Sequence, residues 1–211
     1  MTDRWDLSTR LIEPAPDLLV AQPGRIVELA GMAGMGLTRI GYRMLSEASR
    51  RSPMAVVDVR GWASPAAAWE AGIDRDNLVI VRCAESSTWG QLVAALCEGV
   101  PTVYAEVPSA VRDRDLRRLA ALIRARQVRV VLRPLRGELP GGIAHLRIRA
   151  VGVVWEGAEV GHGRLTHRRL VLEASGKGAA GMVRQIEVED AGEDAVHVVS
   201  GVVSRASGRA G

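Results

Sequence analysis

The chain of 211 residues has no phenylalanine, only two tyrosines and a single lysine. So few aromatic rings argue against a surface that binds single-stranded nucleic acid by stacking its bases. Two cysteines are too few for a disulfide framework and are consistent with reduced, buried thiols. No stretch approaches the roughly 18 consecutive apolar residues of a membrane helix, and the first residues do not resemble a signal peptide. We therefore expect a cytoplasmic protein that does not enter membranes.

Hydrophobic residues make up 47% of the chain, which predicts a folded globular protein. The formal net charge is +4, and nearly all of the positive charge is arginine. This composition allows an anionic partner, although a GC-rich genome produces the same bias because it favours arginine codons. The four histidines and two cysteines lack the spacing of metal ligands, and we expect no metal site.

Apolar runs and helical patterns alternate along the first two thirds of the chain. Runs rich in valine, isoleucine and leucine predict five buried strands, at residues 25–30, 54–59, 77–83, 101–107 and 128–133. Helices are expected between them, at residues 37–52, 65–71, 88–98 and 112–126. This alternation predicts an α/β fold whose mostly parallel sheet carries helices on both faces.

The pattern changes after Pro134, where strands follow one another without helices. Four further strands are expected, at residues 146–155, 164–173, 183–189 and 195–203. Their short, glycine-rich connections favour antiparallel pairing. We expect an N-terminal arm at residues 1–22, a single domain at residues 23–203 and a flexible tail at residues 204–211. Within the domain, residues 23–134 should form the parallel part and residues 140–203 the antiparallel part.

Residues 31–38, Gly-Met-Ala-Gly-Met-Gly-Leu-Thr, have the outline of a phosphate-binding loop. In the pattern Gly-x4-Gly-Lys-Thr/Ser, backbone N–H groups hold phosphates, the lysine neutralises them and the hydroxyl binds Mg²⁺. Gly31, Gly36 and Thr38 have the right spacing, but Leu37 replaces the lysine, and the only lysine of the chain lies far away in the sequence. We interpret the loop as a degenerate remnant and expect no cofactor.

Outward from this loop, the chain resembles the core of the RecA recombinases. Gly24–Leu29 leads into the loop as it does in RecA, and the segment Gly72–Leu78 is the most specific match. Gly141 and Gly142 are similar to paired glycines that precede later RecA strands. The resemblance covers about residues 24–190 and is closest to the RecA-like ImuA proteins of actinobacterial mutagenesis cassettes. It implies a RecA-like P-loop-type core, flanked by helices and followed by antiparallel strands.

Several positions depart from the chemistry that the resemblance implies. Arg60 replaces the glutamate that activates the hydrolytic water, and Ala67 replaces the tyrosine that stacks on adenine. Ser64 stands where RecA has an acidic residue, and Glu106 where it has the aspartate that helps to hold Mg²⁺. Together with Leu37, these changes remove the phosphate cation, the general base and the stacking ring. Since such contacts carry most of phosphoryl-transfer catalysis, we expect no ATPase activity.

Two connections are short where RecA carries its DNA-binding loops. The first is reduced to Val107–Val111 and the second to about Leu135–Pro140. We therefore expect DNA contact to be weak or indirect. Trp62 and Trp69 flank the segment that would frame the adenine, and we expect them to fill the core or that pocket; the alternative is an aromatic anchor for a partner.

The resemblance implies a non-catalytic accessory protein of SOS-induced, mutagenic translesion synthesis. Its implied partner is an ImuB-like homologue of the Y-family polymerases, which works with an error-prone replicative-type DNA polymerase. Three alternatives remain open: a divergent ATPase that uses Arg39 or Arg60 in place of the lysine, a DNA-binding regulator, and a SulA-like inhibitor of cell division.

Two regions are candidates for contact with a partner. The predicted helix at residues 112–126 is the most basic segment of the chain and contains a set of arginines that would face an anion or an acidic partner, namely Arg112, Arg114, Arg117, Arg118 and Arg124. The strands at residues 145–203 end in a segment that would leave an open sheet edge, to which a partner can add a strand.

Overall fold

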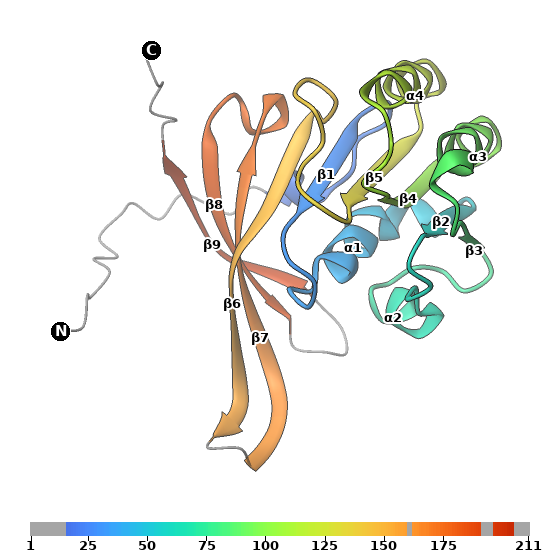
Figure 1. Ribbon diagram of the computed structural model, residues 1–211. Coiled ribbons are helices and arrows are strands. Elements are labelled where there is room, and N and C mark those ends of the chain that lie inside the picture. The colour runs from blue at the N-terminus through green and yellow to red at the C-terminus, as the bar shows by residue number, and fades with distance from the viewer. Residues whose placement is uncertain (1–15, 160–161, 191–195, 205–211) are drawn as a thin grey trace.

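The computed structural model (Figure 1) describes residues 16–159, 162–190 and 196–204. Within these ranges, nine strands form one sheet in the order β3-β2-β4-β5-β1-β6-β7-β8-β9. The expectations for residues 1–15 and for the tail after residue 204 lie outside the described residues.

The first half of the sheet is parallel and has helices in its connections. Its strands are β1 (Ile26–Ala30), β2 (Met54–Asp58), β3 (Leu78–Arg82), β4 (Thr102–Val107) and β5 (Arg129–Pro134). The helices are α1 (Leu37–Ser49), α2 (Pro65–Glu70), α3 (Ser86–Gly99) and α4 (Asp113–Arg126), and a short 3-10 helix, η1 (Pro16–Leu19), precedes β1. These elements agree with the predicted alternation of strands and helices. α1 ends three residues earlier than predicted because Pro53 disfavours helical geometry in the residue before it.

The second half of the sheet contains β6 (Leu146–Glu159), β7 (His162–Ser175), β8 (Val183–Asp190) and β9 (Val196–Ser204), with η2 (Lys177–Ala179) between β7 and β8. β6 lies parallel to β1, with Leu29 beside Ile148, so antiparallel pairing begins only between β6 and β7. β6 and β7 are longer than their apolar patterns predict, and Figure 1 shows their hairpin extending well beyond the rest of the sheet.

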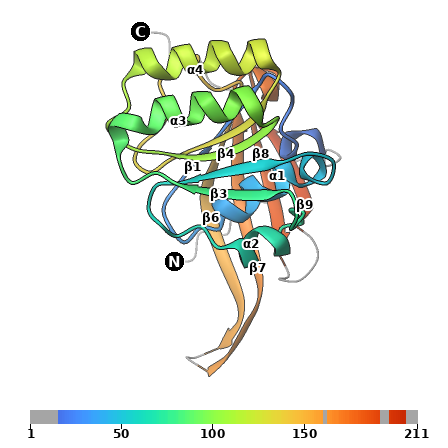
Figure 2. The ribbon, with the colours of Figure 1, turned by 90° about the vertical axis from the view of Figure 1, so that its right-hand side faces the viewer.

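Two hydrophobic cores cover the two faces of the parallel strands. α1 and α2 pack on one face, together with residues of β7 and β8, whereas α3 and α4 pack on the other. Figure 2 shows α3 and α4 lying side by side. Successive strand residues alternate between the cores, as the two-residue period of a strand requires: Met54 and Val56 belong to the first, Ala55 and Val57 to the second.

The connection from β5 to β6 is anchored to β1 by a buried carboxylate. Glu28, fully buried, accepts hydrogen bonds from the backbone N–H of Leu139 and from Nε of Arg147, each at 2.7 Å. Burial raises the pKa of Glu28, while these two donors act to lower it. The connection between β5 and β6 is therefore packed onto the sheet beside the loop at residues 31–36.

Candidate functional site

The loop at residues 31–36 turns from β1 into α1 as a phosphate-binding loop does. Gly31, Gly34 and Gly36 have positive φ angles of 146°, 85° and 72°, which side chains rarely allow. Gly36 directly precedes α1, whose first turn has no side-chain cap. The loop is thus placed at a helix N-terminus, where free N–H groups favour anions.

An arginine from the far half of the sheet covers this helix N-terminus. A Cβ atom added to Gly36 would lie 2.3 Å from Nη1 of Arg168, which belongs to β7. The guanidinium group therefore lies directly against Gly36, at the N-terminus of α1.

Leu37, at the lysine position, is directed into the core. Its side chain is fully buried within the core beneath α1, and a Cβ on Gly31 would lie 2.9 Å from its Cδ1 atom. The position itself therefore faces away from the solvent side of the loop, in an environment that does not suit a charged group.

Arg60, at the general-base position, is bound to Glu106 at the end of β4. Nε and Nη2 of Arg60 donate to Oε1 of Glu106, the first at 2.9 Å. Oε2 accepts the backbone N–H groups of Val59 and Arg60 at 3.0 and 3.1 Å. Glu106, only 5% exposed, thus has both oxygens occupied by donors of its own chain.

Asp58, at the end of β2, organises the turn that follows. Its carboxylate accepts the backbone N–H groups of Gly61, Trp62 and Ala63 at 2.7, 3.0 and 3.2 Å. The exposed guanidinium of Arg82 lies 3.8 Å away. The second carboxylate of the site is therefore also satisfied within the chain.

Thr38 is bound to a third arginine. Nη1 of Arg133, which is buried in β5, donates to the hydroxyl of Thr38 at 2.6 Å. The buried phenol of Tyr104 lies beside both groups; burial raises its pKa, and the charge of Arg133 opposes the rise. Burial likewise raises the pKa of Tyr42, so both phenols stay neutral near pH 7.

These groups leave a cavity of about 20 Å³ between Thr38, Asp58, Arg60 and Glu106. That volume holds about one water molecule. The space between these four side chains is thus largely filled by the chain itself. Among the described residues, no group of three or more acidic, histidine or cysteine side chains is arranged to hold a metal ion.

The two arginines considered as replacements for the lysine are each bound to a carboxylate. Nη1 of Arg39 lies 3.2 Å from Glu70 of α2, and Arg60 is held by Glu106. Ser64 caps α2, since its hydroxyl accepts the backbone N–H of Ala67.

The expectation that Trp62 and Trp69 fill the core is wrong. Trp62 is 69% exposed and Trp69 38% exposed. Each ring contacts a guanidinium, of Arg60 and Arg75 respectively, with the carbon 4.6 and 4.8 Å from the ring centre. Cation–π attraction to arginine stabilises such rings at the surface. Apolar patterns in the sequence do not reveal this pairing, because they indicate burial alone.

The arginines of α4 divide into two groups. Arg112 and Arg114, at the start of the helix, both lie near Asp115, at 3.1 and 3.7 Å. Arg117, Arg118 and Arg124 are exposed along its outer side. The candidate set therefore does not act as one patch, because its first two members share the carboxylate of Asp115.

Arg133 and Arg168 are site residues that the sequence did not identify. Glu106 and Arg133 are register partners in β4 and β5, so an exact alignment of these strands would have placed Arg133 in the site. Two strand pairings, β1 with β6 and β6 with β7, bring Arg168 to the loop, and local sequence patterns do not predict them.

Comparisons with known proteins agree with this architecture. The crystal structure of the RadB recombinase is similar with a TM-score of 0.56 at 14% sequence identity, over 83% of this chain and 92% of that chain. The likeness establishes a RecA-like fold. No curated protein matches the chain. No helix among the described residues is long and apolar enough to cross a membrane. Residues 17–141, more than half of the chain, match the family described as MT3502 N-terminal domain, and the protein therefore belongs to that family.

Proposed function

We propose that the protein is a non-catalytic, RecA-like accessory protein that acts by binding other proteins. The observation that carries the proposal is the occupation of the nucleotide site by the chain's own arginines. Arg60, Arg133 and Arg168 contact the positions at which the fold would hold the general base, Mg²⁺ and phosphate. Each contact would have to break before a nucleotide entered in the usual way.

The energy involved is large compared with ordinary nucleotide affinity. Separating a largely buried ion pair such as Arg60–Glu106 costs roughly 3 kcal/mol, equivalent to about a hundredfold in affinity. The absent lysine removes a further charge contact with the phosphates. Both effects support the expectation that neither ATP binding nor hydrolysis is the activity of this chain.

Beside the loop, the surface offers features of a protein-binding site. A groove of about 440 Å³ is lined by Met32, Met35, Leu135 and Val151 together with charged residues. Met32 is 74% exposed and Val151 45%. Methionine-lined surfaces adapt to apolar partner side chains, which supports a role in protein interaction.

The resemblance to ImuA proteins supplies the partner in this proposal. We infer that the chain binds an ImuB-like homologue of the Y-family polymerases in a DNA-damage-induced mutagenesis complex, and through it an error-prone replicative-type polymerase. Among the described residues, β9 pairs only with β8 and forms one edge of the sheet. Such an edge is a site for strand addition by a partner, so we assign docking to the C-terminal strands.

Capture by a purified ImuB-like protein tests the proposal. Removal of residues 195–211, which include β9, should abolish capture, whereas removal of residues 205–211 alone should preserve it. Circular dichroism should show that the α/β core stays folded in both variants. Normal capture by the longer truncation, or unfolding of the whole domain, would contradict the docking role of β9.

A further inference from the structure

A group of arginines lies at the end of the parallel strands opposite to the loop at residues 31–36. Because β1, β2 and β5 are parallel, the residues that precede them gather at one edge, where α1 and α4 also end. Six arginines occupy this edge, which we name the basic edge: Arg25, Arg50, Arg51, Arg124, Arg126 and Arg129. Five are exposed and Arg129 is half-buried.

The arginines of the basic edge differ from those near the loop in their partners. Within the described parts of the chain, none of the six has an ion pair with a carboxylate. Near the loop, by contrast, arginines are paired with acidic residues, as in Arg39–Glu70, Arg60–Glu106 and Arg147–Glu28. The basic edge thus carries positive charge that its own surroundings do not neutralise.

His145 and Lys177 lie next to the basic edge beside β1. The backbone N–H of His145 donates to the carbonyl of Ile26, which places the imidazole at the start of β1. Its pKa is lowered by partial burial and then by the charges of Arg25 and Lys177. Carboxylates nearby are few: Glu47 and Glu98 at the ends of α1 and α3, and Asp74 and Asp76 toward the β3 side.

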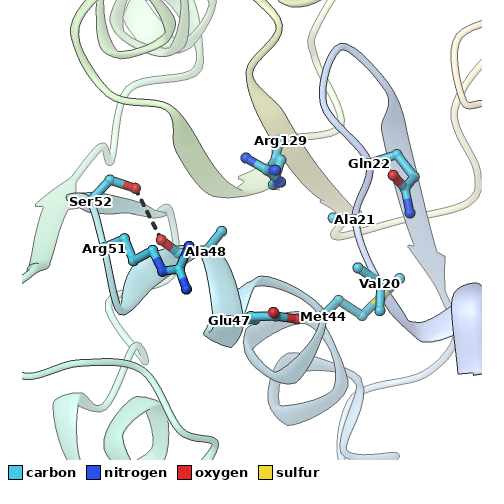
Figure 3. Close-up of a pocket in the computed structure, with 9 residues that line it drawn as sticks. All are labelled: Val20, Ala21, Gln22, Met44, Glu47, Ala48, Arg51, Ser52 and Arg129. Carbon is cyan, nitrogen blue, oxygen red and sulfur yellow. Dashed lines mark hydrogen bonds between the residues drawn. The ribbon is translucent and has the colours of Figure 1, made fainter.

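Within this edge, a cavity of about 300 Å³ places two of the arginines on its walls (Figure 3). Arg51 comes from the turn after α1 and Arg129 from the first position of β5. Gln22 adds an amide to the lining and Glu47 a carboxylate, whereas the Ser52 hydroxyl donates to the carbonyl of Ala48 at 3.0 Å. Guanidinium and amide groups are side-chain donors that bind phosphate oxygens in nucleic-acid complexes.

The side chains of the basic edge favour nucleic acid over an acidic protein as its ligand. Protein interfaces are centred on apolar or aromatic anchors, but the large exposed hydrophobic side chains of the described residues, Val20 excepted, come from other parts of the fold. Val20 itself is only 39% exposed. Arginine forks match the geometry of phosphate groups, and phosphate contacts require no apolar anchor.

We propose that the basic edge binds the phosphate backbone of nucleic acid without reading its sequence, with Arg51 and Arg129 holding one phosphate in the cavity. This function goes beyond protein docking and does not depend on it, because it uses the edge of the sheet opposite to the loop. It also assigns direct nucleic-acid contact to a surface other than the shortened loops that follow β4 and β5.

Fluorescence anisotropy with a labelled DNA duplex of about 30 base pairs tests the proposal. The full chain should bind at about 50 mM salt and weaken steeply toward 200 mM. The double variant Arg51→Gln/Arg129→Gln should reduce the slope of log affinity against log salt by about 0.9, since the two side chains hold one phosphate and each neutralised phosphate contributes about 0.9. The affinity at low salt should fall at least tenfold.

The control removes the same charge from the other end of α4. Arg112→Gln/Arg114→Gln should leave the slope nearly unchanged, because these side chains lie against Asp115. Equal loss in both double variants, or no duplex binding at low salt, would overturn the proposal. So would displacement of the duplex by polyglutamate as efficiently as by unlabelled duplex at equal charge, since that result would identify an acidic protein as the occupant.

Discussion

At the scale of single residues, the ion pair between Arg60 and Glu106 determines the electrostatic character of the end of the sheet beside the loop at residues 31–36. Removing Arg60 leaves a carboxylate that is 6% exposed without its cation. We expect Arg60→Ala to lower the free energy of unfolding in urea by about 3 kcal/mol. Arg82→Ala is the matched control: this arginine is 68% exposed and 3.8 Å from Asp58, and its loss should cost less than about 1 kcal/mol. Equal effects would show that the Arg60 pair is no stronger than a surface contact.

Substitutions at two helical glycines should change the stability of the protein in opposite directions. A Cβ on Gly41 of α1 would lie 2.6 Å from the ring of Tyr104, which is 1% exposed and has no room to move. A Cβ on Gly90 of α3 would meet nothing within 4 Å. Gly41→Ala should therefore destabilise the protein by about 1–3 kcal/mol, whereas Gly90→Ala should stabilise it by up to about 1 kcal/mol. Thermal unfolding measures both, and stabilisation by Gly41→Ala would refute the close packing of α1 on β4.

His145 links charge at the basic edge to stability. Its pKa in the folded chain lies below the ordinary 6.5, so the unfolded chain binds more protons as the pH falls through that value. Stability should consequently decrease as the pH drops below about 6.5. The variant His145→Asn should show a smaller decrease over the same window. Identical pH profiles of unfolding for the two proteins would rule out a contribution from this imidazole.

At the scale of elements, the β6–β7 hairpin consists of two parts. β8 pairs with residues 168–174 of β7, whereas the outer part, beyond the pair Trp155–Arg168, pairs with no third strand in the part of the chain that the structure describes. An isolated two-stranded ribbon adds little stability in water. Replacing residues 156–167 by Asn-Gly, a favoured two-residue turn, should change the free energy of unfolding by less than about 1 kcal/mol. A loss of several kcal/mol would mean that the outer ribbon supports the core.

Sequence patterns predicted the elements better than their pairings. The apolar runs located β1 to β5, and the glycines of residues 31–36 located the start of α1. The parallel position of β6 beside β1 was not predicted, because a parallel and an antiparallel strand can have the same local pattern. The contacts of Arg133 with Thr38 and of Arg168 with Gly36 join residues 95 and more positions apart. Strand order and register create these contacts, and neither is written in a local stretch of sequence.

At the scale of the whole molecule, the two ends of the parallel sheet differ in electrostatic character. Near the loop, Arg60 is paired with the carboxylate of Glu106, and Arg133 donates to the hydroxyl of Thr38. At the basic edge, six arginines have no carboxylate in an ion pair within the described residues. An internally satisfied end has little affinity left for a charged ligand, whereas an unneutralised end attracts one. This asymmetry places ligand binding at the end of the sheet opposite to that expected for a nucleotide-binding RecA-like fold.

The central claim is that the chain's own arginines keep nucleotide out of the loop end. Calorimetric titration of the full chain with Mg²⁺ and ATP tests it most directly, with Leu37→Lys measured in parallel. We expect no saturable binding tighter than millimolar in either protein, because Arg60 and Arg133 still occupy the site when the lysine is restored. Micromolar, Mg²⁺-dependent binding of ATP by the unmodified chain would contradict the claim.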